Sequence, residues 1–205
     1  MPRPPKARPA ILDAAERIVK EHGAANLTFD ELARVSGVTR GGITYHFPTK
    51  EMLLQALVLR DVEHWSRRLT NHRQQLGDCP GAEVIAHLRS AAEDDPERRR
   101  LIGGLLSAVA HDPSLLQPVR EFAREAMPPA SDLCQAELKL WILRMASDGL
   151  FWADMMKCTE LPAGLRERLV AEIERLAAVW GLEAAQAATA PEACTVKGAL
   201  DLKQA

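Results

Sequence analysis

Three features are scarce in this 205-residue chain, and each scarcity excludes a class of protein. Apolar runs are short, and none approaches the ~20 residues that a membrane-spanning helix needs. Strand patterns are also scarce, because no stretch alternates apolar and polar residues with β-branched enrichment. Aromatic residues make up only 4% of the chain, whereas the helix-favouring residues Ala, Leu, Glu and Arg are abundant. The composition therefore predicts an all-α protein.

The cysteines lack the spacing of a metal or redox centre. None are paired as C-x-x-C, and none has a histidine nearby at zinc-ligand spacing. We therefore expect reduced thiols, no metal and no cofactor, with a redox-sensing role as the alternative, at Cys79, Cys134, Cys158 and Cys194. The basic, proline-rich N-terminus has no apolar segment of signal-peptide length behind it, so a cytoplasmic protein is expected.

Charge is distributed unevenly along the chain. Residues 1–60 hold nine Lys or Arg and six Asp or Glu, whereas the rest of the chain is net acidic. A basic end on an acidic body favours a polyanionic partner at that end. Within it, Arg3, Lys6 and Arg8 are compatible with a DNA-binding arm or with an ordinary solvated terminus.

Helical spacing covers most of the chain and is interrupted by Pro and Gly. We predict about nine helices, with approximate bounds 9–21, 28–36, 39–47, 50–75, 82–94, 97–110, 114–127, 131–159 and 163–181. The predicted organisation is a three-helix domain over 1–50, a larger helical domain over 51–182, and a mobile tail over 183–205.

The most informative segment runs from Thr28 to Leu57. Thr28 precedes Glu31 at capping-box spacing, and Gly37 supplies a turn before a second short helix. Small residues at the crossing and a glycine in the turn are what a helix-turn-helix requires. Two consecutive glycines, Gly41 and Gly42, then cost about 1 kcal/mol each inside a helix. They either allow a close approach to DNA or allow close helix packing.

At this point the sequence resembles the TetR family of transcriptional regulators, over about residues 9–57. The resemblance rests on Ile11-Leu12-Asp13-Ala14-Ala15, Gly23, Thr28, Leu32-Ala33, Gly37-Val38-Thr39, Gly41, Ile43, His46-Phe47 and Lys50-Glu51. The resemblance implies that residues 1–50 are a DNA-binding domain and residues 51–182 a ligand-binding and dimerisation domain. It also implies a homodimer that represses a palindromic operator and is released when a small molecule binds the C-terminal domain. One departure is that Thr44, and not an aromatic residue, follows Ile43, and Tyr45 comes next.

DNA contacts are expected from the residues at the N-terminal ends of the second, third and fourth helices and from the exposed side of the third helix. Arg40 is the candidate for a bidentate contact to guanine, and Lys50 for a phosphate contact at a helix N-terminus. His46 either reaches the DNA backbone or packs inside the domain. The full predicted set is Thr28, Thr39, Arg40, Gly41, Gly42, Thr44, Tyr45, His46 and Lys50.

One face of the predicted 131–159 helix carries two tryptophans and two acids. Such a face suits an apolar ligand, neutral or cationic, but Trp and Met at helical spacing also form ordinary core, and Asp148 is also suited to a simple ion pair. The predicted ligand-binding residues are Leu105, Phe122, Glu137, Trp141, Met145, Asp148, Trp152 and Met155.

The predicted last helix has an apolar stripe that needs a partner. The resemblance implies that the last two helices of each subunit form a four-helix dimer interface. The residues expected there are Leu165, Leu169, Ile173, Leu176 and Trp180.

Two rival functions, an enzyme and a helical scaffold, compete with a DNA-binding regulator. An enzyme is disfavoured because the chain has no G-x-S-x-G, no H-E-x-x-H and no phosphate-cradling glycine loop, so no catalytic residues are assigned. A helical scaffold without DNA binding is disfavoured by Arg40, Tyr45 and Lys50, each of which stands where a groove or phosphate contact is expected.

Overall fold

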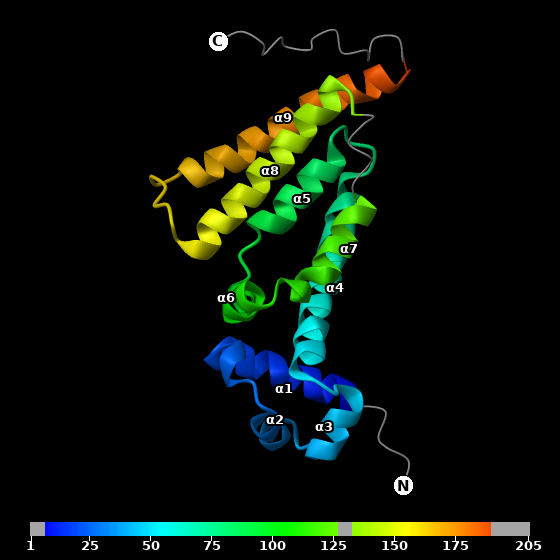
Figure 1. Ribbon diagram of the computed structural model, residues 1–205. Coiled ribbons are helices and arrows are strands. Elements are labelled where there is room, and N and C mark those ends of the chain that lie inside the picture. Colours follow the sequence, from blue (N-terminus) through cyan, green and yellow to red (C-terminus); the bar gives the residue numbers. More distant parts are fainter. Residues whose placement is uncertain (1–6, 127–132, 190–205) are drawn as a thin grey trace, which may run out of the picture. The chain divides into compact units, whose positions relative to one another are not determined.

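The computed structural model describes residues 7–126 and 133–189, and these residues are almost entirely helical (Figure 1). They form nine α-helices and two short 3-10 helices, and no strand occurs among them, which confirms the all-α prediction. None of the helices in these two ranges is long and apolar enough to cross a membrane. The predicted arm residues Arg3 and Lys6 and the predicted tail residues 190–205 lie outside the described residues.

The described residues divide into two compact units. The first consists of the described parts of Met1–Ser66 and Asp94–Ala126, and the second of the described parts of Arg67–Glu93 and Met127–Ala205. This division differs from the predicted boundary at residue 50, because the helix α6 (Pro96–His111) packs on the first helix, α1 (Ala7–His22).

The first unit begins with three helices that surround an apolar core. These helices are α1 (Ala7–His22), α2 (Phe29–Ser36) and α3 (Arg40–His46), and a 3-10 turn, η1 (Ala24–Asn26), joins the first two. The sequence signals for their ends are confirmed. The Thr28 hydroxyl oxygen accepts from the Glu31 amide at 3.2 Å, and Gly37 ends α2 with a left-handed φ of 68°.

Helix α4 (Lys50–Leu76), α6 (Pro96–His111), η2 (Pro113–Leu116) and α7 (Gln117–Ala126) complete the elements that contribute to this unit. Apolar side chains of α1, α2, α3, α4 and α6 meet in one cluster, whose fully buried members include Ile11, Ile18, Leu32, Ile43, Leu53 and Leu57. Burial of these side chains is the main stabilising term that holds the short helices α2 and α3 in place.

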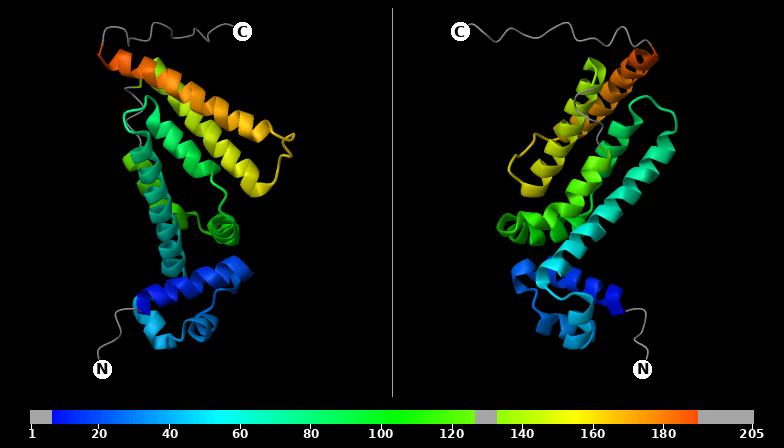
Figure 2. Two further views of the ribbon diagram at one scale, coloured as in Figure 1. Left: turned by 180° about the vertical axis from the view of Figure 1, so that it is seen from behind. Right: turned by 45° about the vertical axis from the view of Figure 1, so that its right-hand side comes forward.

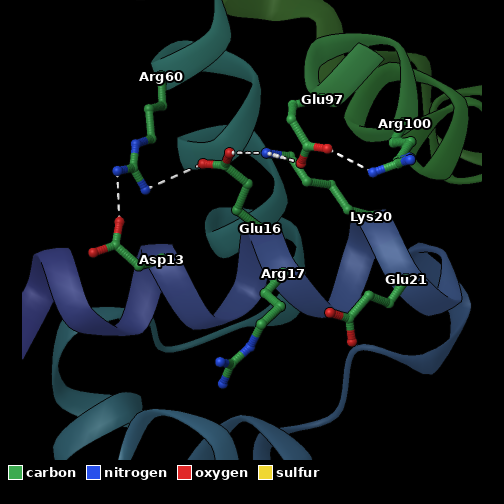
Figure 3. A pocket seen from close by; sticks show the side chains of 8 residues that line it. All are labelled: Asp13, Glu16, Arg17, Lys20, Glu21, Arg60, Glu97 and Arg100. Atoms are coloured by element: carbon green, nitrogen blue, oxygen red, sulfur yellow. Dashed lines mark hydrogen bonds and ion pairs between the residues drawn. The ribbon is translucent and has the colours of Figure 1, made fainter.

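A network of ion pairs also fastens α1 to α4 and α6 (Figure 3). Its members are Asp13, Glu16 and Lys20 of α1, Arg60 of α4, and Glu97 and Arg100 of α6. Positive and negative side chains alternate through this network. Its N–O distances range from 2.5 Å for Arg60–Asp13 to 3.4 Å for Lys20–Glu97. They line an open groove whose walls are charged, so the groove does not suit an apolar ligand.

The second unit contains α5 (Ala82–Ala92), α8 (Gln135–Met156) and α9 (Leu165–Thr189), which lie side by side in both figures of the whole chain (Figures 1 and 2). Their shared core contains Val84, Ile85, Leu88, Leu143, Ile173 and Ala177. Gly81 and Gly181 let α9 approach the start of α5 closely, because a Cβ on Gly181 would lie 2.1 Å from the Gly81 nitrogen.

Helix α9 corrects the predicted tail. The helix continues to Thr189, so residues 183–189 are helical, whereas the prediction placed them in a mobile segment. The alanines of this stretch have high helix propensity, and no proline interrupts them before Pro191. The predicted helix ended too early because this stretch is rich in small and polar residues, so its sequence shows no clear apolar stripe.

Candidate nucleic-acid interface

The turn between α2 and α3 is held by backbone and side-chain hydrogen bonds. The Ser36 hydroxyl oxygen accepts from the Val38 amide at 3.2 Å, and the Gly37 amide donates to the Ala33 carbonyl at 3.0 Å. Ala33 and Val38 are partly buried against the core, as a helix crossing requires. Thr39 then caps α3 by accepting from the Gly42 amide at 3.2 Å. The predicted helix-turn-helix is therefore present.

Helix α3 has one buried and one exposed side. Ile43 is fully buried, whereas Tyr45 on the opposite side is 71% exposed, and Arg40, Gly41 and Thr44 are exposed with it. An exposed helix edge with donors and an aromatic ring is the form of surface that enters a DNA groove. The structure thus brings together four of the predicted DNA-contact residues.

Gly42 is a correction to the predicted contact set. It is buried on the inner side of α3, and its amide donates to Thr39. The adjacent Gly41 is exposed, and a Cβ placed on it would meet no atom within 4 Å. The two glycines therefore differ, because Gly42 is buried and Gly41 leaves the outer backbone of α3 uncovered.

The remaining predicted contacts lie around this edge. Thr28 and Thr39 are exposed caps, whose hydroxyl oxygens accept helix amides. Lys50 begins α4 and donates from its Nζ to the Ala25 carbonyl at 3.2 Å, so its ammonium is already directed toward the backbone of η1. His46 packs edge-on against Tyr45, and its buried Nε2 has no hydrogen-bond partner within the described residues, which favours packing for this side chain.

Sequence reasoning missed the partner of Arg40. The Arg40 Nη1 donates to the Asp30 carboxylate at 2.6 Å, and the Thr44 hydroxyl donates to the Arg40 carbonyl at 2.9 Å. Asp30 belongs to α2, ten residues earlier, so no helical periodicity links the two residues. Arg8, from the predicted arm, lies with its guanidinium 5.3 Å from the centre of the Phe47 ring.

The predicted ligand face of α8 divides into two parts. Met145 and Trp152 are exposed, whereas Trp141, Asp148 and Met155 are half-buried. Asp148 pairs with the buried His87 of α5, with 2.7 Å between its Oδ1 and the ring Nε2. The buried side of α8 consists instead of Ala136, Leu143 and Ser147.

The three remaining members of the predicted ligand set are Glu137, Leu105 and Phe122. Glu137 closes a capping box, because its carboxylate accepts from the Cys134 amide at 2.8 Å. Leu105 is buried in the core of the first unit, and Phe122 is half-buried in α7. Beside Trp141, Arg144 lies with its guanidinium 5.2 Å from the ring centre, and burial lowers the pKa of Arg144.

The predicted dimer residues include one correction. Ile173 is buried within its own unit against α5 and α8, so it is not available to a partner subunit. Leu176 and Trp180 are partly buried against the same core, and Leu165 and Leu169 are half-buried. The exposed apolar surface lies elsewhere, mainly on α8, at Leu138, Ile142, Met145, Trp152 and Met156, with Val179 and Leu182 of α9.

Two family models match the chain. Residues 11–57 match the bacterial regulatory proteins of the tetR family, and residues 81–178 match the C-terminal domain of tetracyclin repressor-like proteins. The first match covers the helix-turn-helix, and the second covers α5 to most of α9.

Curated relatives match mainly through the N-terminal segment. The chain is 43% identical over 53 residues to the transcriptional regulator TtgR of Pseudomonas putida, covering 26% of this chain and 25% of TtgR. It is 42% identical over 55 residues to the repressor BepR of Brucella suis, covering 27% and 26%. The chain thus spans about a quarter of the length of these relatives. A longer match, 30% identical over 100 residues, covers 47% of this chain and 46% of the regulator AcrR of Shigella flexneri.

Solved structures share the fold over most of the chain. A TetR-family member from Streptomyces coelicolor, SCO1917, matches with a TM-score of 0.62 and 24% identity, covering 84% of this chain and 98% of that one. The multidrug binding protein EbrR in complex with malachite green matches with a TM-score of 0.62 and 23% identity, covering 84% and 98%. At these identities the likeness establishes the fold.

Proposed function

Because this chain belongs to the TetR family of bacterial regulatory proteins, we propose that it is a DNA-binding transcriptional repressor released from its operator by a small molecule. The observation that carries this proposal is the exposed edge of α3, where Arg40, Thr44 and Tyr45 project from a helix whose other side is anchored by buried Ile43. Family membership, and not a missing catalytic motif, is the reason to regard the protein as a regulator and not an enzyme.

Each side chain of this edge suits a particular part of a duplex. The Arg40 guanidinium has the donor geometry for the two acceptors of guanine, and the Thr44 methyl group suits the methyl of thymine. The Tyr45 hydroxyl suits a phosphate oxygen. Thr28, Thr39 and Lys50 stand at the N-terminal ends of α2, α3 and α4, where helix dipoles favour phosphate groups.

A homodimer is proposed from the exposed apolar side of α8. Leu138, Ile142, Met145, Trp152 and Met156 lie on one side of α8. Neighbours are three or four residues apart, except for Met145 and Trp152, which are seven apart with the exposed Gly149 between them. Val179 and Leu182 add apolar surface on the neighbouring helix α9. A four-helix contact between two subunits would cover this surface, which is too apolar to be left in water without a partner.

The dimer sets the geometry of the operator. A two-fold axis between the subunits places two α3 helices on one side of the duplex, so the operator is expected to be a palindrome. Its half-sites are expected about one helical turn apart (~34 Å), or somewhat more.

The inducer is proposed to be an apolar molecule, neutral or cationic. EbrR, which shares the fold, is a multidrug binding protein with structures in complex with malachite green, ethidium and proflavin. In this chain Trp141, Asp148 and Met155, with Glu137, are the half-buried members of the predicted ligand face. A cation would have to compete with His87 for the Asp148 carboxylate. Control of an efflux or detoxification gene is the physiological role that fits such a ligand.

Release of DNA follows from linkage. A ligand that prefers a conformation in which the two α3 helices are not spaced to fit the operator weakens DNA binding. DNA weakens ligand binding by the same factor. A coupling of ~3 kcal/mol corresponds to about a hundredfold loss of operator affinity.

A gel-shift titration tests the proposal. The full chain is titrated onto the DNA upstream of its own gene at moderate salt with an excess of unrelated competitor duplex. A specific shift supports a repressor, whereas no shift on any duplex with ligand-free protein supports a helical scaffold instead. A thermal-shift screen with separate sets of lipophilic cations, acids and neutral aromatics then identifies the ligand class.

A further inference from the structure

Asp30 and Arg40 form an ion pair across the helix-turn-helix, on the side that carries the exposed edge of α3. Asp30 is the second residue of α2, and Arg40 is the first residue of α3. The Arg40 Nη1 lies 2.6 Å from the Asp30 Oδ1, and the two side chains are 65% and 78% exposed, respectively. The pair is therefore accessible to a macromolecular partner and does not belong to the core.

Stability does not account for this pair. Ion pairs at such exposure contribute little to the free energy of folding. Asp30 also carries a negative charge at the N-terminal end of α2, a position that otherwise attracts phosphate. A carboxylate at a DNA-facing surface weakens binding through repulsion unless it has a compensating role in recognition.

The geometry supplies such a role. A guanidinium has five N–H donors in one plane, and a guanine contact uses two parallel ones. Asp30 engages Nη1, which leaves the Nε and Nη2 edge of Arg40 to the duplex. The ion pair fixes one end of the Arg40 guanidinium plane and so restricts the rotamers of this side chain before DNA binds. Less conformational entropy is therefore lost on binding. Thr44 adds a bond to the Arg40 carbonyl and holds the backbone beneath it.

We propose that Asp30 is a specificity-determining residue that positions the Arg40 guanidinium for a guanine in each operator half-site. This inference rests on the proposed function, since it requires that α3 reads DNA. Asp30 acts through Arg40, and its carboxylate stays paired in the complex.

The test is a base-preference profile. The operator is first obtained by selecting duplexes bound by the full-length wild-type chain from a randomised pool. Affinities are then measured for that operator and for its single-base-pair variants, with wild type, Asp30→Asn, Arg40→Ala and the double variant. Glu21→Gln is the matched control, because it makes the same change of charge on an exposed residue of α1. Circular dichroism and the thermal midpoint verify that each variant is folded at the temperature used.

Asp30→Asn is expected to reduce the preference for guanine at one base pair of each half-site, by about fivefold to a hundredfold, and to leave the other positions unchanged. Arg40→Ala is expected to abolish the preference at that same base pair. The double variant is expected to be no worse than Arg40→Ala alone, because the two residues act as one unit.

Two results would overturn the inference. One is that Asp30→Asn strengthens binding to every duplex alike, scrambled ones included, to the same degree as Glu21→Gln, since Asp30 would then be only a repulsive charge. The other is an unchanged base-preference profile. Failure of the proposed function is distinguishable, because the wild-type chain itself would then select no sequence.

Discussion

A Cβ atom placed on Gly104 would lie 2.3 Å from the carbonyl oxygen of Val19, so α6 and α1 meet backbone to backbone at this point. The helix that carries the DNA-binding core and a helix from the middle of the chain are thereby packed into one unit. The ion pair between Lys20 of α1 and Glu97 of α6 adds a second contact between the same two helices.

Gly104→Ala is expected to destabilise the protein by about 1–3 kcal/mol, because the added methyl group forces two backbones apart. A denaturant titration measures the change. The matched control is Gly41→Ala, also in a helix of the first unit, where the added methyl group meets no atom within 4 Å. The control is expected to be neutral or stabilising by up to ~1 kcal/mol. Equal stabilities of Gly104→Ala and wild type would show that the close contact does not exist.

The ion pair between Asp61 and Arg98 gives a second prediction. Its two N–O distances are 2.8 and 3.1 Å, the side chains are 17% and 15% exposed, and the guanidinium lies 4.6 Å from the centre of the Trp65 ring. Asp61→Ala removes the main charged partner of a mostly buried cation, so we expect a loss of about 1–3 kcal/mol in the free energy of unfolding.

The combined variant Asp61→Ala/Arg98→Met is expected to regain part of that loss, because an apolar replacement removes the buried charge. Glu172→Gln, which breaks the exposed pair with Arg175, serves as the control and is expected to change the free energy of unfolding much less than Asp61→Ala does. If Asp61→Ala behaves like Glu172→Gln, the contribution of the buried pair is refuted.

Stability at acid pH is expected to depend on Glu31. Its carboxylate accepts two hydrogen bonds from Arg34, and this lowers the pKa of Glu31 below its ordinary value of 4.5. A lowered pKa in the folded state means that the stabilisation is present above pH 4.5 and is lost as the pH falls through the folded-state pKa. The free energy of unfolding, measured from pH 6 down to about pH 3, is therefore expected to fall less steeply in Glu31→Gln than in wild type. Parallel curves for the two proteins would contradict the assignment.

Dimer formation is expected to depend on the exposed stripe of α8. Ile142→Glu places a charge in the middle of that stripe, so we expect a monomer by sedimentation analysis and a large loss of operator affinity. Leu59→Glu is the matched control, because Leu59 is an exposed leucine of α4 that does not belong to the stripe. The control is expected to keep the oligomeric state of wild type. A dimeric Ile142→Glu variant would place the interface elsewhere.

Local signals explain why the helix-turn-helix was predictable. Thr28, Gly37 and Thr39 fix helix ends through interactions within a few residues, so a sequence pattern suffices to place them. The distinction between Gly41 and Gly42 was not predictable in the same way. The two are adjacent in sequence, and only the packing of α3 on the core decides which of them is buried.

Long-range pairing explains the rest. Asp30 and Arg40 meet because two helices cross, and Asp148 meets His87 because α8 packs on α5. The sequence periodicity of α8 predicts an apolar side along the helix. Because α8 has apolar residues on more than one side, the periodicity does not select which side is buried. Which side faces its neighbours depends on the direction from which α5 and α9 approach. The assignment of Ile173 to a dimer interface was wrong for the same reason.

Selection from a randomised duplex pool tests the central claim most directly, namely that the Arg40–Tyr45 edge of α3 reads DNA. The ligand-free wild-type chain and an Arg40→Ala/Tyr45→Ala variant are taken through the same selection. We predict that wild type enriches one palindromic motif with half-sites about one helical turn (~34 Å) or somewhat more apart, and that the variant does not. Enrichment of the same motif by both proteins, or of no motif by wild type, would contradict the account.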